Sequence, residues 1–433
     1  EIAQCLVGSE MCIRDSKIIE NHSSFKETIR CLQEDKMKVE PKIREFICTT
    51  AHPEGCREYV RRQIAYVRSQ ERKKGRKQEP KKVLVIGAST GYGLASRITA
   101  GFGCGAATIG IMFEKPSNGK RTATPGWYNT AAYEEEAQKA GLYAKSINGD
   151  AFSKAVKEET IALIKRDWGK ADMVIYSLAA PRRTDKNGNL WVSSLKTTKE
   201  AFTEKSLDLR NNTIVEKTVE PAKPEEIQGT KKVMGGEDWM EWIEALKEAD
   251  VLTENAITVA YSYIGPKLTY PIYFDGTIGQ AKRHLENTAK AMREKFPDLQ
   301  AYVSVNKALV TQASAAIPIV PLYFAILYKV MKEVGNHEGC IEQISRLFKE
   351  KLFKESVPTD AEGRIRMDDW ELSEEVQRKV VEAWKQVTTE NVTEISDIEG
   401  YWEDFYQMFG FHLAGVDYTK DVDMEVKIPS IDL

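Results

Sequence analysis

The stretch "PKKVLVIGASTGYGLASRITAGFG", residues 80–103, is the strongest indication of the fold of this chain. A short apolar run from Val83 to Ile86 is followed by Gly87, Gly91 and Gly93, and then by a helix-forming segment. Glycines at such a turn let the backbone approach a pyrophosphate, and the next helix directs free N–H groups and its positive dipole end at the same place. The stretch therefore predicts a strand, a dinucleotide-binding turn and a helix.

Five later segments continue this alternation of strands and helices. Their apolar runs lie within residues 107–116, 141–152, 171–183, 255–265 and 301–311. The alternation predicts an α/β fold, a Rossmann-type doubly wound parallel sheet with helices on both faces. A long polar excursion at about residues 182–235 separates the fourth strand from the fifth, and we expect a lid-like insertion there over the substrate.

The second strand ends in an acid, Glu114, 21 residues after Gly93. A carboxylate at this position accepts hydrogen bonds from the adenosine ribose and repels a 2′-phosphate, which favours NADH over NADPH. Lys115, the next residue, would soften that exclusion. The alternative interpretation is an ordinary exposed acid at a strand end.

A tyrosine and a lysine stand nine positions apart in "YPIYFDGTIGQAK", residues 270–282. On one α-helix this spacing would put Tyr273 and Lys282 on opposite faces. An Asp-Gly turn signal lies between them, and Thr277 with Gln280 fits the capping box that opens a helix. We expect Tyr273 on a loop and Lys282 in the second turn of the following helix, so that both reach one ligand. A core tyrosine and a surface lysine are the alternative.

Composition excludes several classes of partner. The 433 residues are 42% hydrophobic and 29% charged, with a net charge of −3, so bulk attraction to nucleic acid or an anionic membrane is not expected. Residues 308–328 carry no charge over 21 positions, but Pro318 and Pro321 interrupt them. We expect a strand end and a buried helix here, with no membrane span. Such a helix could also line an acyl-chain pocket.

The seven cysteines show no CxxC pattern, and Cys48 and Cys56 flank His52 too loosely for a zinc site. No metal is therefore expected, and reduced thiols fit a cytoplasmic location.

The first 36 residues look foreign to the rest of the chain. "VGSEMCIRDS", residues 7–16, can be back-translated into DNA similar to a transposon adapter, and residues 33–37 can be encoded with a ribosome-binding sequence just before Met37. We interpret residues 1–36 as a non-native extension made of adapter and translated upstream DNA. Residues 37–433 are expected to form a single domain.

Longer stretches carry a resemblance to a known family. They include "ICTTAHPEGC", "VLVIGASTGYGLASR", "YSLAAPRR", "YSYIGPKLTYPIY" with "GTIGQAK", "SVNKALVTQASAAIPIVPLY", "NHEGCIEQI" and "DDWEL". From Met37 onward the chain resembles the NADH-dependent trans-2-enoyl-CoA reductases, of the family that includes the V-type enoyl-acyl-carrier-protein reductases. The eight-residue gap between Tyr273 and Lys282 separates this group from other short-chain reductases, whose gaps are shorter. The resemblance implies a bacterial, monomeric enzyme of fatty acid metabolism or butyrate-type fermentation that reduces enoyl-CoA thioesters such as crotonyl-CoA.

The resemblance also implies a role for individual residues. Tyr273 would be the catalytic acid, Lys282 would bind the nicotinamide ribose, and Tyr263 would touch the substrate carbonyl. The implied cofactor-binding residues are Gly87, Ala88, Ser89, Thr90, Gly91 and Tyr92 at the pyrophosphate, Phe113 and Glu114 at the adenosine, Asp150 and Ala151 at the adenine, Leu178 and Ala179 beside the cofactor, and Leu309, Val310 and Thr311 at the nicotinamide amide. The expected cofactor is NADH, with no flavin and no metal.

The chemistry of the residues agrees with these roles. Hydride delivery to an enoyl thioester drives negative charge onto the thioester oxygen, and a phenol can stabilise that charge. A nearby ammonium favours ionised tyrosine, so Lys282 could also ease proton donation by Tyr273. Three alternatives stay open: an enoyl-acyl-carrier-protein reductase of fatty acid synthesis, a carbonyl or alcohol oxidoreductase with the same pair, and a non-catalytic NADH-binding protein.

Overall fold

The computed structural model describes residues 36–44, 47–70, 80–178, 180–311, 317 and 319–431. Residues 1–35, which we interpret as part of a non-native extension, lie outside the described residues. The expected cofactor contact Ala179 lies outside them as well.

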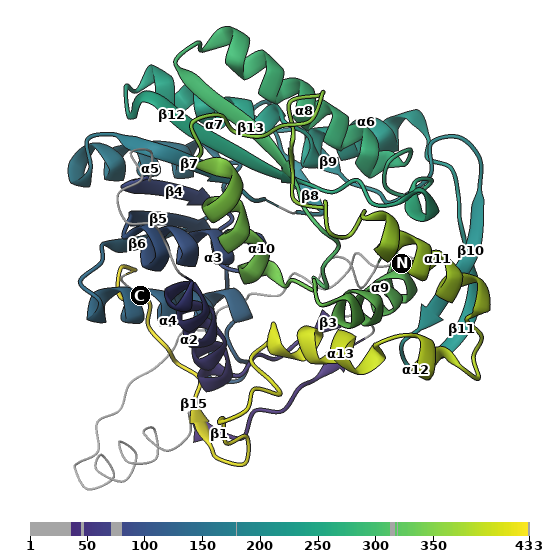
Figure 1. Cartoon of the computed structure of the whole chain (residues 1–433). Helices are drawn as coiled ribbons and strands as arrows, with labels where there is room; N and C mark the ends of the chain where they lie inside the picture. Colours follow the sequence, from purple (N-terminus) through teal and green to yellow (C-terminus); the bar gives the residue numbers. More distant parts are fainter. Residues whose placement is uncertain are drawn as a thin grey trace, which may run out of the picture.

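A seven-stranded parallel sheet forms the centre of the molecule (Figure 1). Its spatial order is β14-β13-β12-β7-β4-β5-β6, so the chain starts in the middle and winds outward in both directions. The strands are β4 (Lys82–Ile86), β5 (Ala107–Met112), β6 (Ala144–Asn148), β7 (Ala171–Tyr176), β12 (Leu252–Ser262), β13 (Leu299–Val305) and β14 (Ile365–Arg366). The Rossmann-type sheet and its six expected strands are confirmed. β14 was not foreseen, because two residues are too few to show a periodic pattern.

Helices cover both faces of the sheet, as expected for a doubly wound fold. One face packs against α5 (Lys154–Asp167), α7 (Glu237–Glu248) and α8 (Thr277–Lys295). The other face packs against α2 (Pro53–Ser69), α3 (Gly91–Ile98), α4 (Pro125–Lys139) and α10 (Cys340–Arg346). The central strands β4, β5 and β7 are almost wholly buried, which explains why they read as continuous apolar runs.

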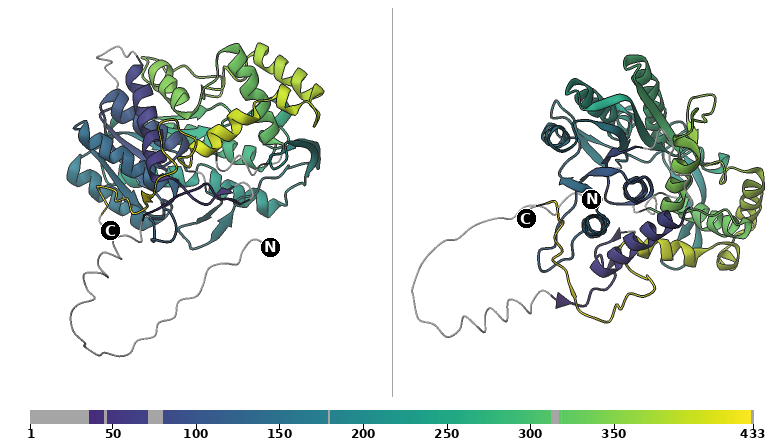
Figure 2. Two further views of the ribbon diagram at one scale, coloured as in Figure 1. Left: turned by 90° about the horizontal axis from the view of Figure 1, so that it is seen from below. Right: turned by 60° about the vertical axis from the view of Figure 1, so that its left-hand side comes forward.

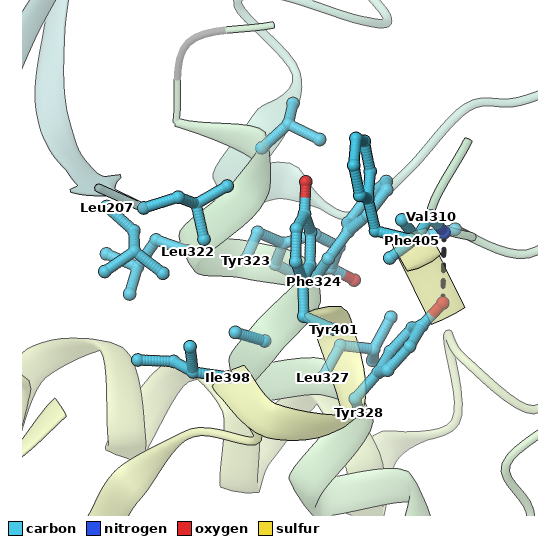
Figure 3. Close-up of a cluster of buried hydrophobic side chains, with 14 of the residues drawn as sticks. Leu207, Val310, Leu322, Tyr323, Phe324, Leu327, Tyr328, Ile398, Tyr401 and Phe405 are labelled. Atoms are coloured by element: carbon cyan, nitrogen blue, oxygen red, sulfur yellow. Dashed lines mark hydrogen bonds between the residues drawn. The ribbon is translucent and has the colours of Figure 1, made fainter. Parts of the chain in front are cut away.

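A third apolar cluster lies beyond the carboxyl ends of the strands, on the side of Figure 1 where the C-terminal helices gather. It joins α9 (Val320–Val334), α11 (Glu374–Gln386), α12 (Val392–Ile395) and α13 (Ile398–Gln407). Tyr323 and Leu327 of α9 and Phe405 of α13 belong to this cluster (Figure 3). Eleven of the 15 residues of α9 are buried, so its apolar character reflects a position inside the protein. Within the described ranges, no helix combines the length and the apolar character that a membrane crossing requires.

The polar excursion after the fourth strand folds into two hairpins and a helix. These are β8 (Arg182–Thr184) with β9 (Leu190–Val192), β10 (Phe202–Asp208) with β11 (Thr213–Val219), and α6 (Pro224–Met234). The Lys205 Nζ atom on β10 donates hydrogen bonds to the carbonyl oxygens of Trp384 and Val387 at the end of α11. The second hairpin is thus tied to the C-terminal helices, and its opening as a lid stays a prediction.

Segments from the two ends of the described chain run side by side (Figure 2). β1 (Lys36–Met37) pairs with β15 (Val422–Asp423), and β2 (Ile43–Arg44) pairs with β3 (Ile47–Cys48). The remaining short elements are a 3₁₀ turn at Lys267–Thr269 and π-helical turns at Thr99–Gly103 and Leu347–Leu352.

Candidate active site

The glycine turn after β4 is shaped so that only glycine fits. Gly87 has a φ of 83°, and a Cβ atom there would lie 2.2 Å from the carbonyl oxygen of Ser177. A Cβ atom on Gly93 would lie 1.8 Å from the carbonyl oxygen of Gly87. The chain therefore enters α3 in a tight turn against the end of β7. Thr90 and Gly91, at the N-terminus of α3, border a cavity of about 490 Å³.

Glu114 lies beside this turn, just past the end of β5. Its Oε1 atom accepts a hydrogen bond from the Ser89 hydroxyl at 2.6 Å, and the Asn148 side chain bonds the backbone N–H and carbonyl of Glu114. Burial raises the pKa of the Glu114 carboxyl, while the Ser89 hydrogen bond acts against that rise. The neighbouring Phe113 ring is 78% exposed, which is unusual for so large an apolar group. A carboxylate next to an open aromatic face suits the ribose and base of an adenosine.

The next expected contacts follow the same edge of the sheet. Asp150 follows β6, and its Oδ1 atom accepts a hydrogen bond from the Phe152 N–H at 3.0 Å. Ala151 is buried and its carbonyl oxygen accepts from the Trp242 indole. Leu178 follows β7 and touches the glycine turn, because its Cδ2 atom lies 3.2 Å from the Cβ position of Gly87.

Leu309, Val310 and Thr311 follow β13 and reach the same cavity as the glycine turn. The Val310 N–H donates a hydrogen bond to the Tyr328 hydroxyl on α9 at 3.0 Å (Figure 3). Two groups of expected cofactor contacts that are distant in sequence therefore line the same cavity: Thr90 with Gly91, and Leu309 to Thr311.

Tyr273 and Lys282 come from a loop and from the helix that follows it. α8 begins at Thr277, so Lys282 stands in its second turn as expected. The predicted capping box is wrong, because Gly276 is the N-cap and the Thr277 hydroxyl donates to the Ser194 carbonyl oxygen instead. The Lys282 Nζ atom donates to the carbonyl oxygen of Tyr261 at 3.1 Å. Burial lowers the pKa of Lys282 to about 8, against the opposing charge of Glu286.

The Tyr273 phenol lies in surroundings that keep it neutral. Its side chain is 6% exposed, and the Tyr263 ring stands edge-on to it with the ring centroids 4.7 Å apart. Burial raises the pKa of Tyr273, and the negative charge of Glu371 raises it further. This direction is opposite to the one expected from Lys282 alone. A neutral phenol can donate a hydrogen bond to a developing oxyanion.

Tyr263 is held by Glu371, a residue that no motif indicated beyond its place in the stretch "DDWEL". The Tyr263 hydroxyl donates to the Glu371 Oε1 atom at 3.0 Å. The Tyr323 hydroxyl donates to the same oxygen at 2.6 Å, and the Ala308 N–H donates to Oε2 at 2.7 Å. The proton of Tyr263, expected at a substrate carbonyl, is thus engaged within the protein.

Other lining residues of the cavity were also missed by sequence reasoning. They come from α2, α9, α10 and α13 and include Tyr59, Arg62, Lys332, Glu342, Glu403, Asp404 and Gln407. No motif spacing connects these positions, because helix packing brings them together. Tyr263, Tyr273 and Lys282 are not among the residues that line this cavity. In the described part of the chain, no cluster of three or more His, Cys, Asp or Glu side chains could hold a metal ion.

Comparison with known proteins identifies similar chains. Residues 121–353 match the family model described as trans-2-enoyl-CoA reductase catalytic region, and residues 38–119 match the NAD(P)H binding domain of trans-2-enoyl-CoA reductase. The enoyl-acyl-carrier-protein reductase (NADH) of Flavobacterium johnsoniae is 57% identical over 91% of this chain and 100% of its own length. The trans-2-enoyl-CoA reductase (NADH) of Ruminiclostridium cellulolyticum is 54% identical over 91% and 100%. The Treponema denticola trans-2-enoyl-CoA reductase, solved in complex with NAD, is 49% identical, with a TM-score of 0.88 over 90% of this chain and 100% of that one.

A third family match corrects the cofactor expectation. Residues 359–422 match a model described as enoyl reductase FAD binding domain, so the expectation of no flavin is wrong. Within this segment, Glu403, Asp404 and Gln407 border the cavity that the glycine turn also borders. Their side chains could accept hydrogen bonds from the hydroxyl groups of a flavin nucleotide. A flavin held there would supply hydride or single-electron transfer.

Proposed function

Because this chain belongs to the trans-2-enoyl-CoA reductase family, we propose that it uses NADH to reduce the trans-2 double bond of enoyl-CoA thioesters to saturated acyl-CoA. The observation that carries the proposal is the buried, neutral Tyr273 phenol on the loop before α8, at the carboxyl edge of a sheet whose glycine turn suits a dinucleotide. Two relatives with more than half of their residues identical to this chain bear NADH-dependent enoyl reductase names.

Under this proposal NADH lies along the carboxyl edge of the sheet. The turn from Gly87 to Tyr92 holds the pyrophosphate, and Phe113 and Glu114 hold the adenosine. Asp150, Ala151 and Leu178 lie along the cofactor, and Leu309 to Thr311 contact the nicotinamide amide. The cavity shared by Thr90, Gly91 and residues 309–311 supports this path. The Lys282 ammonium, which donates a hydrogen bond to the carbonyl oxygen of Tyr261, binds the hydroxyl groups of the nicotinamide ribose.

NADH supplies hydride to C3 of the enoyl thioester. The π pair of the C2–C3 double bond then forms a C1–C2 double bond, and the carbonyl π pair moves onto the thioester oxygen. Tyr273 donates a hydrogen bond to that oxygen as its charge develops. C2 then takes a proton that water supplies and the carbonyl re-forms, so that the products are the saturated thioester and NAD⁺. Losing one such donor typically costs about 10²–10³-fold in turnover, which sets the scale of the effect expected from Tyr273.

The test is a spectrophotometric assay of NADH oxidation with crotonyl-CoA. Turnover of crotonyl-CoA without turnover of simple ketones or aldehydes supports the proposal. Reduction of ketones in preference to crotonyl-CoA would establish the carbonyl reductase alternative. NADH binding without turnover of any enoyl thioester would establish a non-catalytic binding protein.

The identity of the acyl carrier is a second candidate point, because the Flavobacterium johnsoniae relative is named for the acyl-carrier-protein substrate. Comparing kcat/KM for crotonyl-CoA with that for the crotonyl acyl carrier protein, over several chain lengths, separates the two. A higher value for the protein carrier would assign the chain to fatty acid synthesis. A cytoplasmic location and a monomeric state stay predictions for fractionation and sedimentation to test.

A further inference from the structure

Glu371 joins three parts of the molecule that are distant in sequence. It follows β14, is 0% exposed, and receives hydrogen bonds from the segment after β12, from α9 and from the segment after β13. The donors are the hydroxyls of Tyr263 and Tyr323 and the backbone N–H of Ala308. Three donors on two oxygens favour the ionised carboxylate, because protonation would turn one acceptor position into a donor.

This buried charge is costly to keep. Among the described residues no lysine or arginine lies within ion-pair distance of the Glu371 carboxylate, although Lys307 is near enough for its charge to lower the pKa of Glu371. Burial acts in the opposite direction, and the net pKa of Glu371 is raised. A buried carboxylate that is held by hydrogen bonds without an ion pair is costly to desolvate, and removing its charge leaves those donors without their acceptor.

The position of these bonds shows what they control. Tyr263 stands edge-on against Tyr273, and Ala308 directly precedes the Leu309 to Thr311 segment that borders the cavity. One carboxylate therefore sets the orientation of Tyr263, which packs on the expected proton donor, and anchors the start of the expected nicotinamide contact.

We propose that Glu371 is a positioning residue of the reductase site, which engages the Tyr263 proton so that Tyr273 alone donates to the substrate and which fixes the segment that meets the nicotinamide. The proposal rests on the enoyl reductase function proposed above. It also gives the 359–422 segment a role at the reacting end of the site.

Glu134 provides a matched control for Glu371. It is also buried, and its Oε1 atom accepts from two hydroxyls, those of Ser146 and Ser430, while Oε2 accepts the Ser430 N–H. It differs in lying 3.6 Å from Arg97 and in its place against β6, away from the tyrosine pair. Both substitutions have the same chemical effect. In Glu371→Gln and in Glu134→Gln one of the two acceptor oxygens becomes an amide N–H₂ group, which is itself a donor and cannot accept the existing hydrogen bond.

The experiment compares both variants in kcat, NADH affinity and melting temperature with crotonyl-CoA as substrate. Glu371→Gln should lower kcat by about ten- to hundredfold, the range for losing hydrogen bonds to a charged group, with a smaller change in NADH affinity. Glu134→Gln should lower the melting temperature and keep kcat within a few-fold of wild type. Equal effects of the two variants on kcat would overturn the proposal.

Two further readouts separate positioning from stability. In a double-mutant cycle, Tyr263→Phe combined with Glu371→Gln should cost much less than the product of the single effects, because Glu371 acts through Tyr263; multiplicative effects would count against this. The wild type should also lose activity as pH falls through the raised pKa of Glu371, since the charged form positions the site, and Glu371→Gln should lack that loss. The titratable groups that interact with Glu371 are Tyr263, Tyr323, Tyr273, Tyr92, Lys307 and Asp368.

Failure of the proposed function can be told apart from failure of this inference. Wild-type protein that turns over no enoyl thioester would refute the function and leave the kinetic comparison without a baseline. In that case ¹³C-labelled tyrosine spectra, with Tyr263→Phe and Tyr273→Phe for assignment, still report on the positioning without substrate. Glu371→Gln should shift both tyrosine signals and Glu134→Gln neither; unshifted signals in Glu371→Gln would refute the positioning role.

Discussion

The Tyr263 ring stands edge-on to the Tyr273 ring, with centroids 4.7 Å apart and ring planes at 88°. This is a favoured arrangement for aromatic pairs, so each ring restricts the other. The two phenols nevertheless differ in their hydrogen bonding, because the Tyr263 hydroxyl donates to Glu371. Two tyrosines ten positions apart in the sequence are thereby given different tasks.

Replacing Tyr273 by Phe should lower kcat by about 10²-fold or more, because the ring and its packing remain while the donor hydroxyl is lost. NADH affinity, measured by fluorescence titration, should stay close to wild type. Tyr263→Phe should cost less. If the double Phe variant reduces crotonyl-CoA at near the wild-type rate, the mechanism proposed here is refuted.

Removing the Lys282 ammonium should weaken NADH binding and turnover together. Burial lowers the pKa of Lys282 to about 8, so the unliganded protein loses this charge as pH rises through that value. The Kd for NADH should therefore rise between about pH 7 and pH 9 in the wild type, by up to the factor that Lys282→Ala shows at neutral pH. Lys282→Arg, which stays charged, is the control. A wild-type Kd that does not change over this interval would exclude the ammonium from NADH binding.

Glu114 should determine the preference for NADH over NADPH. Glu114→Gln removes the negative charge near the adenosine ribose but keeps a side chain that can meet the Ser89 hydroxyl. We expect kcat/KM to fall for NADH and to rise relative to it for NADPH. Ser89→Ala removes the hydrogen bond between Ser89 and Glu114 but leaves the charge of Glu114, so this variant should retain the preference for NADH. An unchanged ratio in Glu114→Gln would remove Glu114 from the cofactor site.

The glycine turn can be tested by adding single methyl groups. In Gly93→Ala the new Cβ atom would lie 1.8 Å from the Gly87 carbonyl oxygen, so the turn must open. NADH binding should be lost and the melting temperature should fall. Gly105→Ala meets open space at a φ of 69° and should cost only about 1–2 kcal/mol of stability. A Gly93→Ala variant that binds NADH like the wild type would show that the turn adopts another shape.

Much of the fold and part of the site could be predicted from local pattern. The apolar run from Val83 to Ile86 and the glycines that follow it specify a strand, a turn and a helix, because each of these elements depends on residues within one short segment. The start of α8 at Thr277, and so the loop position of Tyr273, was also readable, although the choice of capping group was not. The Thr277 hydroxyl donates a hydrogen bond to the carbonyl oxygen of Ser194, which is 83 positions away and cannot be inferred from the local sequence.

Local sequence patterns specify the alternation of strands and helices and the residue types at the carboxyl edge of the sheet, because hydrophobic period and turn chemistry act over a few neighbouring residues. The groups that face Tyr273 depend instead on how the whole chain packs. Glu371 meets Tyr263 across 108 positions, and burial, which depends on the packing of the whole chain, sets the directions in which the pKa values of Tyr273 and Lys282 move. Long-range contacts of this kind leave no periodic pattern in the sequence. The residues around Glu371 would look the same whichever distant groups it contacted.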